Sequence, residues 1–466
     1  MTDISVQNIK EIPQGKSYDA NAKLSFMEKA GFGAGDAACN MLFNPITMFL
    51  SFFYTDIFGL TPAIVATMFL VVRCIDAIFD PLYGAFIDKT KSRHGTYRPW
   101  MILFAIPFAI SCMVMFYTPD ISGTAKVIYA FVTYLVLSIL YSCVNVPYCS
   151  LATRLSADLK ERVSMQKFRF VGAGLASIFC TLTLLPLVNY LGGGDRQLGF
   201  FYVVSIFGFI ALILFFFCFT STTERVKPQH EQEESIISSF KKICHNDQWF
   251  VCMALMFLDC MPSFIRGAAS IYFAKYVLGF GDGVATIFLA ASIVANIVGA
   301  GITDYLTNIW CKVTVYKGVK LTCIVLSMLL LVIPSDNLFM IWTVFIVLSV
   351  IHQIATPIIW SFISDVDDYG EYKLHQRASG LCASGNLFTL KVALGVGGAL
   401  VGMVLSLSGY EANVETQSSG AIDGIYALMT WIPAIFYFIT FATTHYLYKL
   451  NRTNMQMINN ALFAKA

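Results

Sequence analysis

Residues 199–219 read GFFYVVSIFGFIALILFFFCF, a stretch without a charged side chain that is long enough, as a helix, to cross a lipid bilayer. Apolar and polar residues do not alternate along it, so a helix is expected rather than a strand of a barrel. The whole chain is 57% hydrophobic and 13% charged, whereas soluble domains carry about a quarter charged residues. The sequence therefore predicts an all-α membrane protein.

Stretches of this kind recur about twelve times, six on each side of a polar segment at 222–248. This rhythm predicts a first six-helix bundle at 31–220 and a second at 249–448. A short segment at 1–30, a central loop at 221–248 and a tail at 449–466 complete the chain. The expected spans are 32–58, 62–87, 100–117, 127–151, 165–190, 199–219, 249–278, 284–305, 319–333, 338–363, 380–407 and 425–447.

Basic residues gather on one side of the predicted bundles. Under the twelve-span count, the stretches 89–98, 154–162, 312–320 and 373–377 fall on the same side and hold most of the lysines and arginines near span ends. By the positive-inside rule, these loops, both termini and the central loop face the cytoplasm. The net charge of +2 hides this asymmetry and gives no reason to expect a nucleic-acid partner.

The sequence lacks motifs for covalent chemistry. Its thirteen cysteines lie mostly inside spans without a CxxC pair, and small apolar packing residues are the expected interpretation. The glycine runs at 31–35 and 395–398 lack the lysine of a phosphate-binding loop, so close helix packing explains them better. Because no nucleophile with its base and no metal constellation is recognisable, we expect neither an enzyme nor a cofactor.

Three ionisable residues share one face of the span at 62–87. Arg73, Asp76 and Asp80 are spaced i, i+3 and i+7, which on a helix places them within an arc of about 60°. Two carboxylates beside a guanidinium can hold a proton or a small cation. A static ion-pair network is the competing interpretation, but a surplus carboxylate in the membrane favours cation binding.

Polar side chains of the first and fourth spans could contact a small polar solute. Asp36 and Asn40 lie one helical turn apart, and for Asp36 a helix-start cap competes closely with a solute contact. Amide and phenol groups suit sugar hydroxyls, which both donate and accept hydrogen bonds. The fourth span offers such groups around a proline, together with a serine: Tyr141, Ser142, Asn145 and Tyr148.

Other charged residues lie within or near the later spans. Lys391 is too deep to snorkel easily, so it should meet a carboxylate across the bundle or a solute oxygen. Arg169 could bind solute or snorkel to the surface, and Trp360 could line the same cavity. Asp259 and Arg266, at i and i+7, could pair with each other.

Six short motifs are spread over nearly the whole chain. They are FYTD at 53–56, RxxDAIxDP at 73–81, KSRxGxxRPW at 91–100, NVPY at 145–148, GGGD at 192–195 and DYGEYKLH at 368–375. This combination resembles the glycoside-pentoside-hexuronide:cation symporter family. The resemblance implies a major-facilitator-type fold in a bacterial inner membrane. Its two six-helix bundles have pseudo-twofold symmetry and enclose a cavity that opens alternately to either side.

The resemblance also implies a cation site. Asp76 and Asp80 match the family's cation ligands, Ser142 matches a hydroxyl ligand, and we place Arg73 beside them as a coupling residue. An asparagine ligand of the family is replaced by Phe79, which offers no oxygen. Because Na+ needs several oxygens and a proton needs one poised carboxylate, this difference favours H+ over Na+ as the coupling ion.

The implied sugar site is less negative than in the best-known members of the family. Two sugar-binding aspartates match Asn40 and Asn145, and a stacking tryptophan matches Cys149, whereas the arginine and the deep lysine match Arg169 and Lys391. A neutral pentoside or glycoside, or an acidic hexuronide, would be tolerated there.

Charged residues near the predicted cytoplasmic loops could form a gate. Arg154 and Arg162 of the first half could pair with acids of the second half and separate when the cavity opens inward. Solvated loop charge is the competing interpretation, and the sequence favours it slightly. The acids are Asp365, Asp367, Asp368 and Glu371.

Together these features predict a secondary active transporter that carries a glycoside, pentoside or hexuronide with H+ or, less favoured, Na+. Cation binding at Asp76 and Asp80 would lower the cost of closing around the sugar. An uncoupled facilitator or exchanger is the alternative within transport, and a membrane-embedded enzyme or transporter-like sensor is the alternative from another class. The expected partners are the sugar, the cation and lipid, and the protein is expected to work as a monomer.

Overall fold

All regular secondary structure in the described part of the chain is helical, which confirms the predicted all-α fold. The structure is a computed structural model. Of the expected segments, residues 1–22 of the amino-terminal stretch, 227–240 of the central loop and 464–466 of the tail lie outside the described residues. The described residues are 23–89, 92–93, 95–226, 241–279, 282–334, 337–375, 377–411 and 416–463.

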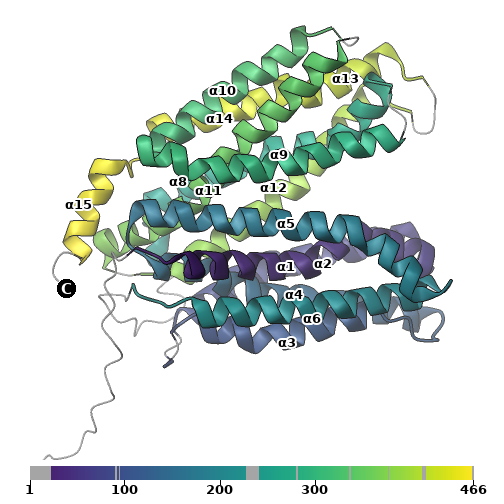
Figure 1. Cartoon of the computed structure of the whole chain (residues 1–466), viewed down its shortest axis with the longest axis horizontal. Helices are drawn as coiled ribbons and strands as arrows, with labels where there is room; N and C mark the ends of the chain where they lie inside the picture. The colour runs from purple at the N-terminus through teal and green to yellow at the C-terminus, as the bar shows by residue number, and fades with distance from the viewer. Residues whose placement is uncertain are drawn as a thin grey trace, which may run out of the picture.

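The first half of the chain forms one bundle, drawn in purple to teal in Figure 1. A short π-helical turn, η1 at Phe53–Ile57, extends its first helix. Within this bundle α1 packs against α5 and α6, and α3 packs against α4 and α6. Its helices are α1 (Phe26–Phe52), α2 (Pro62–Ile87), α3 (Arg98–Met115), α4 (Thr124–Leu155), α5 (Leu159–Gly192) and α6 (Arg196–Ser221).

The second half forms a matching bundle, green to yellow in Figure 1, and α15 (Arg452–Phe463) follows it. The last predicted span is split into two helices at Thr430, because Pro433 has no N–H to donate to the preceding turn. The helices are α8 (Asp247–Tyr272) with its π-helical extension η2 (Phe273–Val277), α9 (Asp282–Ile309), α10 (Lys312–Val332), α11 (Leu338–Leu374), α12 (Ser379–Leu407), α13 (Ser419–Met429) and α14 (Trp431–Tyr446).

The helices agree with the number and positions of the predicted spans. Within the described residues, nine helical segments are long and apolar enough to cross a membrane, one of them formed by α13 and α14 together. Some side chains of α1, α2 and α9 lie outside the described part, and these helices, of 27, 26 and 28 residues, occupy the other three predicted positions.

Helix α1 begins earlier than its apolar stretch suggests. The Ser25 side chain accepts a hydrogen bond from the backbone N–H of Glu28, and the Glu28 carboxylate accepts one from the N–H of Ser25. This capping box starts the helix at Phe26. The alternative that Asp36 is the helix-start cap is therefore wrong, since Asp36 lies almost three turns inside the helix.

Glycines allow α1 and α5 to pack backbone against backbone. A Cβ atom placed on Gly33 would lie 2.5 Å from the carbonyl oxygen of Phe168, and one on Gly172 would lie 2.5 Å from that of Gly33. Close packing is thus confirmed for the run at 31–35. In the run at 395–398 it is confirmed for Gly397, where a Cβ atom would lie 3.0 Å from the Cβ of Phe264, and it is wrong for Gly395 and Gly398, because no described atom lies within 4 Å of a Cβ placed there.

The two bundles meet along α2 with α12, α5 with α9 and α11, and α4 with α12 (Figure 1). One end of the molecule holds the α2–α3, α4–α5 and α11–α12 connections together with α15. We call it the basic end, because the basic stretches of the sequence lie there. Both bundles present charged side chains at the middle of this interface and at the basic end.

Candidate substrate and cation site

Two carboxylates and one ammonium group meet between the bundles. Asp76 and Asp80 lie on α2, one turn apart, and both are buried. The Lys391 Nζ atom on α12 lies 2.7 Å from Asp80 Oδ2 and 3.4 Å from Asp76 Oδ2. The predicted partner of Lys391, a carboxylate across the bundle interface, is therefore present.

Two serines of α4 complete this group. The Ser138 hydroxyl lies 2.8 and 2.7 Å from the two carboxylate oxygens of Asp76, to which it donates. Lys391 Nζ donates to Ser142 Oγ at 3.5 Å. Ser138 was not among the predicted site residues, although it precedes Ser142 by one turn and so shares its helix face. We call Asp76, Asp80, Ser138, Ser142 and Lys391 the middle cluster.

The described side chains of the middle cluster include more carboxylates than cations. Two carboxyl groups face one ammonium group, and Asp80 Oδ1 is buried without a hydrogen-bond partner in the described part of the chain. Phe79 has no side-chain oxygen to offer, and its ring stacks on that of Tyr83. The Arg73 side chain lies outside the described residues, so its place as a coupling residue stays a prediction. A proton or a small cation would balance the cluster.

Arg169 on α5 is the centre of the candidate sugar site. Its Nε atom lies 3.1 Å from Asp36 Oδ1, and its guanidinium lies 4.0 Å from the centre of the Trp360 ring on α11. Both bundles therefore contribute to this site. Asn40 Nδ2 donates to the Asp36 backbone oxygen at 2.9 Å. Arg169 Nη1 is buried and makes no hydrogen bond within the described residues, so it can donate to a solute oxygen.

The remaining sugar-site candidates on α4 surround Arg169 or lie one turn away. Tyr148 is fully buried and its hydroxyl donates to the Phe32 carbonyl oxygen at 2.7 Å. Asn145 Oδ1 accepts from the Cys149 thiol at 3.7 Å. The Tyr141 ring stacks on a phenylalanine of α1. Their contacts with a sugar stay predictions, and the engaged hydroxyl of Tyr148 gives it a structural role.

A separate charged pair lies inside the second bundle. Asp259 on α8 pairs with Lys320 on α10 and accepts a hydrogen bond from Tyr316 at 2.9 Å. The predicted pairing of Asp259 with Arg266 is wrong, because a neighbouring helix supplies the lysine. The Arg266 guanidinium instead lies over the Phe345 ring.

At the basic end, Arg162 of α5 reaches across to α11. Its Nη1 atom lies 2.6 Å from Asp368 Oδ2 and 3.4 Å from Asp365 Oδ1, and all three side chains are fully buried. Both α5 and α11 continue past their apolar stretches, so these residues lie on helices. The interpretation as solvated loop charge is wrong for them, because ion pairing across the interface permits their burial.

Two further cations, which were not among the predicted gate residues, belong to this network. Arg377 lies 3.0, 2.7 and 2.8 Å from carboxylate oxygens of Asp367, Asp368 and Glu371, and its Nη2 atom donates to the Thr153 carbonyl of α4 at 3.2 Å. Lys312 lies 2.6 Å from Asp365. We call this network the basic-end cluster; its members are Arg162, Lys312, Asp365, Asp367, Asp368, Glu371 and Arg377.

Arg154 does not join the basic-end cluster. Its Nη1 atom donates to the Val226 carbonyl oxygen at 3.3 Å, and its guanidinium lies over the Tyr97 ring. Both partners belong to the first half of the chain, so the predicted pairing of Arg154 with acids of the second half is wrong. The chain that follows α6 folds back and supplies its partner.

Asp88 forms another contact between the bundles. It follows α2, and its carboxylate accepts hydrogen bonds from the N–H groups of Gly380 and Leu381 at the start of α12, at 2.7 and 3.2 Å. The Tyr97 hydroxyl donates to it at 2.5 Å. Burial raises the pKa of Asp88 to about 6, although these hydrogen bonds lower it in part. The carboxylate thus caps a helix of the opposite bundle.

Comparison with known proteins agrees with this architecture. Residues 31–452 match the model of a family described as MFS/sugar transport protein. The chain belongs to this family. The resemblance to the glycoside-pentoside-hexuronide:cation symporters is confirmed. As a member of the family the protein is a multi-pass membrane transporter and not an enzyme.

Individual relatives cover nearly the whole chain. It is 37% identical to the inner membrane symporter YicJ of Escherichia coli strain K12, over 94% of this chain and 95% of that protein. It is 32% identical to the isoprimeverose transporter of Lactiplantibacillus pentosus, over 92% and 90%. The fold is similar to that of FucP, a major facilitator superfamily transporter solved in the outward conformation, with a TM-score of 0.68 at 13% identity over 91% and 98% of the two chains.

Proposed function

We propose that this protein is a symporter that carries a glycoside, pentoside or hexuronide together with a proton across a bacterial inner membrane. The middle cluster binds the coupling ion, and the site around Arg169 binds the sugar. Both termini face the cytoplasm, and a single chain suffices for transport. The names of two relatives, a symporter and an isoprimeverose transporter, support the substrate class and the coupling.

The observation that carries this proposal is that Asp76, Asp80 and Lys391 meet between the bundles, with Asp80 Oδ1 buried and without a hydrogen-bond partner among the described residues. A buried carboxylate oxygen without a partner is costly, and a proton or cation that binds there would relieve this cost. Lys391 contacts the carboxylates from the opposite bundle, so occupation of the cluster affects how the bundles approach each other. This arrangement gives the ion different interaction energies in different conformations, which coupling requires.

The position of Lys391 supports H+ over Na+ as the coupling ion. Its ammonium group lies between the two carboxylates, where a Na+ ion bound by both would also lie. A Na+ ion would have to displace this like charge. A proton can add to a carboxylate oxygen, such as the unpartnered Oδ1 of Asp80, without displacing it.

The basic-end cluster supports alternating access. It joins α5 to α11 through fully buried ion pairs, while Asp88 joins α2 to α12. These contacts close the basic end, which is the cytoplasmic end under the positive-inside rule. Release of sugar and proton to the cytoplasm then requires that these pairs separate and become hydrated.

The test is the external pH of lightly buffered, de-energised cells that express the protein. Neutral glycosides, pentosides and hexuronides are added in turn. A transported sugar should alkalinise the medium as protons enter with it, and the Asp76→Asn variant should abolish the signal. Proton symport would be contradicted if the protein is expressed and takes up a labelled sugar from this panel, but no sugar of the panel changes the external pH.

A facilitator or exchanger is the second candidate, because the middle cluster could remain closed by Lys391 throughout transport. It predicts uptake of labelled sugar to equilibrium without accumulation. The Asp76→Asn variant would then equilibrate sugar as the natural protein does, and sugar addition would not change the external pH.

A further inference from the structure

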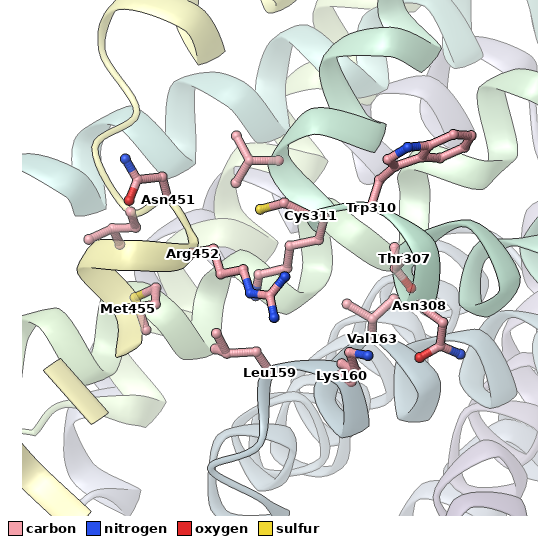
Figure 2. A pocket seen from close by; sticks show the side chains of 13 residues that line it. Leu159, Lys160, Val163, Thr307, Asn308, Trp310, Cys311, Asn451, Arg452 and Met455 are labelled. Atoms are coloured by element: carbon pink, nitrogen blue, oxygen red, sulfur yellow. The ribbon is translucent and has the colours of Figure 1, made fainter. Parts of the chain in front are cut away.

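A pocket opens at the basic end, apart from the middle cluster and the site around Arg169. Its cavity volume is about 60 Å³, and it is open to the surface. Its walls come from the first turn of α5, the α9–α10 connection and the start of α15 (Figure 2). Both bundles therefore line it. The residues that carry the argument are Lys160, Asn308, Trp310, Lys312, Asn451 and Arg452.

The pocket is positively charged. Three of its lining residues are cations and none is an acid. Lys312 is neutralised by Asp365, whereas Lys160 and Arg452 make no ion pair within the described part of the chain. Figure 2 shows the side chains of Lys160 and Arg452 directed into the same space, with the amide of Asn308 beside Lys160. An anion in this space could accept hydrogen bonds from two cations and an amide.

The start of α10 adds to this positive potential. Its first residue, Lys312, lines the pocket, and no side chain caps the first N–H groups of the helix. The N-terminus of a long helix attracts anions. The charge of the pocket thus comes mainly from its side chains, and the helix contributes in the same direction.

An apolar groove adjoins the pocket. Trp310 lines both cavities, and the groove continues from it along α10 toward the middle of the molecule. The groove contains no charged side chain, and its polar lining is limited to two threonines. Its apolar walls come from α9, α10 and α11: Leu306, Val315, Val319, Ile351 and Ile354.

We propose that the pocket and the groove together bind one anionic phospholipid of the leaflet at the basic end. The phosphate group lies between Lys160 and Arg452, and one acyl chain lies in the groove beside Trp310. A basic recess at the membrane surface followed by an apolar channel matches the two parts of such a lipid. A soluble phosphate would fill the recess and leave the groove empty.

The bound lipid would favour closure of the basic end. Lys160 belongs to α5 of the first bundle, whereas Arg452 follows the second bundle. The phosphate therefore bridges the two halves next to the Lys312–Asp365 pair. α15 already contacts the first bundle, since Asn459 Nδ2 donates to the Ala157 carbonyl oxygen at 3.0 Å. Anionic lipid would thereby shift the transporter toward the conformation that is closed at this end.

The test is a titration of the purified full-length protein in zwitterionic detergent with phosphatidylglycerol, followed by native mass spectrometry. Each lysine or arginine near an anionic lipid surface strengthens lipid binding about fivefold. The Lys160→Gln/Arg452→Gln variant should therefore bind the first lipid about 25-fold more weakly. Phosphatidylcholine should show no comparable first site.

Two control variants make the result specific. Arg93→Gln/Lys241→Gln removes the same charge at the same end outside the pocket and should bind phosphatidylglycerol as the natural protein does. Gly318→Leu fills the groove, and no described atom lies within 4 Å of a Cβ at this position, so the fold should tolerate it. It should weaken lipid binding while the thermal midpoint without lipid stays unchanged.

Three outcomes would overturn the proposal. The first is equal affinity for phosphatidylglycerol in the Lys160→Gln/Arg452→Gln variant and the natural protein. The second is unchanged lipid affinity in Gly318→Leu. The third is a thermal stabilisation by inorganic phosphate alone that equals the stabilisation by phosphatidylglycerol, which would identify a soluble anion as the occupant.

Discussion

The middle cluster and the basic-end cluster both join the two bundles through buried ion pairs, but they differ in how the carboxylates meet their cations. Among the described side chains of the middle cluster, two carboxylates share the ammonium group of Lys391, and one oxygen of Asp80 has no hydrogen-bond partner. In the basic-end cluster four carboxylates are divided among three cations, and Arg377 alone contacts three of them.

This difference separates two kinds of function. The middle cluster can change its occupant while the helices stay in place, because one oxygen of Asp80 has no hydrogen-bond partner within the described residues and the lysine side chain is 14% exposed. The basic-end cluster is buried, and its pairs between Arg162 and the acids Asp365 and Asp368 cross the interface, so they separate when the bundles move apart. The first arrangement suits ion binding and the second suits a gate.

The largest effect on the two clusters is expected when Arg162 is replaced. In Arg162→Met the carboxylates of Asp365 and Asp368 lose a buried partner, which costs about 3–5 kcal/mol. We expect the basic end to open. Spin labels at positions 93 and 449, in a background where the exposed Cys244 is replaced by serine, should report longer distances between the bundles.

The matched control for the gate is Lys373→Met. Lys373 pairs with Asp247 at the same end, but this pair is exposed and lies within the second bundle. It should contribute less than about 1 kcal/mol, and the spin-label distances should stay unchanged. Equal opening in both variants would mean that burial across the interface does not distinguish the gate.

The middle cluster is tested by Asp80→Asn, which removes the charge of this side chain and keeps its shape. Concentrative uptake should fall about 100-fold, because the coupling between ion and sugar is lost. Exchange of labelled for unlabelled sugar across the membrane should continue, since it needs no net ion movement. Counterflow and accumulation assays in proteoliposomes measure the two activities separately.

A variant of the pair inside the second bundle is the control for coupling. Asp259→Asn/Lys320→Met removes two buried charges that do not cross the interface. It should retain accumulation of the sugar. If this variant lost accumulation while Asp80→Asn kept it, the coupling ion would have to bind in the second bundle.

A smaller effect is expected from Gly84→Ala, which forces α2 away from α12 near the gate. A Cβ atom on Gly84 would lie 2.5 Å from the Gly380 carbonyl oxygen of the opposite bundle. Overpacking of this kind costs about 2 kcal/mol, so the same spin labels should report a larger open population. Gly402→Ala on α12 is the control, since no described atom lies within 4 Å of a Cβ there.

The smallest effect concerns pH at the basic end. The pKa of Asp88 is raised to about 6 by burial in the closed state, and hydration in an open state should return it to its ordinary value. The closed state then holds more protons than the open state, so closure is favoured at low pH and weakens as pH rises through about 6.

Between pH 7 and pH 5 the ratio of closed to open protein should therefore rise about tenfold on account of Asp88. Asp88→Asn should remove this dependence, because the amide oxygen can still accept hydrogen bonds from α12 but does not titrate near these values. The spin-label populations measured at both pH values check this, and an unchanged pH response in the variant would assign it to another group.

The main features of the fold and the middle cluster could be predicted from sequence because the membrane imposes simple rules. Spans need long apolar stretches, and a charge within one needs a partner, which singled out Asp76, Asp80 and Lys391. Ser138 was missed because a lone serine inside a span is common, although its one-turn spacing from Ser142 was a usable signal. The Ser25-x-x-Glu28 capping box was likewise visible and would have excluded Asp36 as a cap.

The basic-end cluster, which we propose as a gate, could be predicted only in part. Hydropathy ends a span where polar residues begin, so Arg162 and the acids of α11 were assigned to loops, although both helices continue through them. Burial of such residues depends on which charges the other bundle supplies. Local spacing does not reveal that partner, which is why Arg377 and Asp88 were missed and Arg154 was assigned a wrong one.

The central claim is that the middle cluster couples sugar movement to protons. The most direct measurement is sugar accumulation in proteoliposomes under an imposed pH gradient without Na+, and under an imposed Na+ gradient without a pH difference. We expect accumulation driven by the pH gradient alone, and we expect Asp80→Asn to abolish it. Accumulation driven only by Na+, or equal accumulation in the variant, would contradict it.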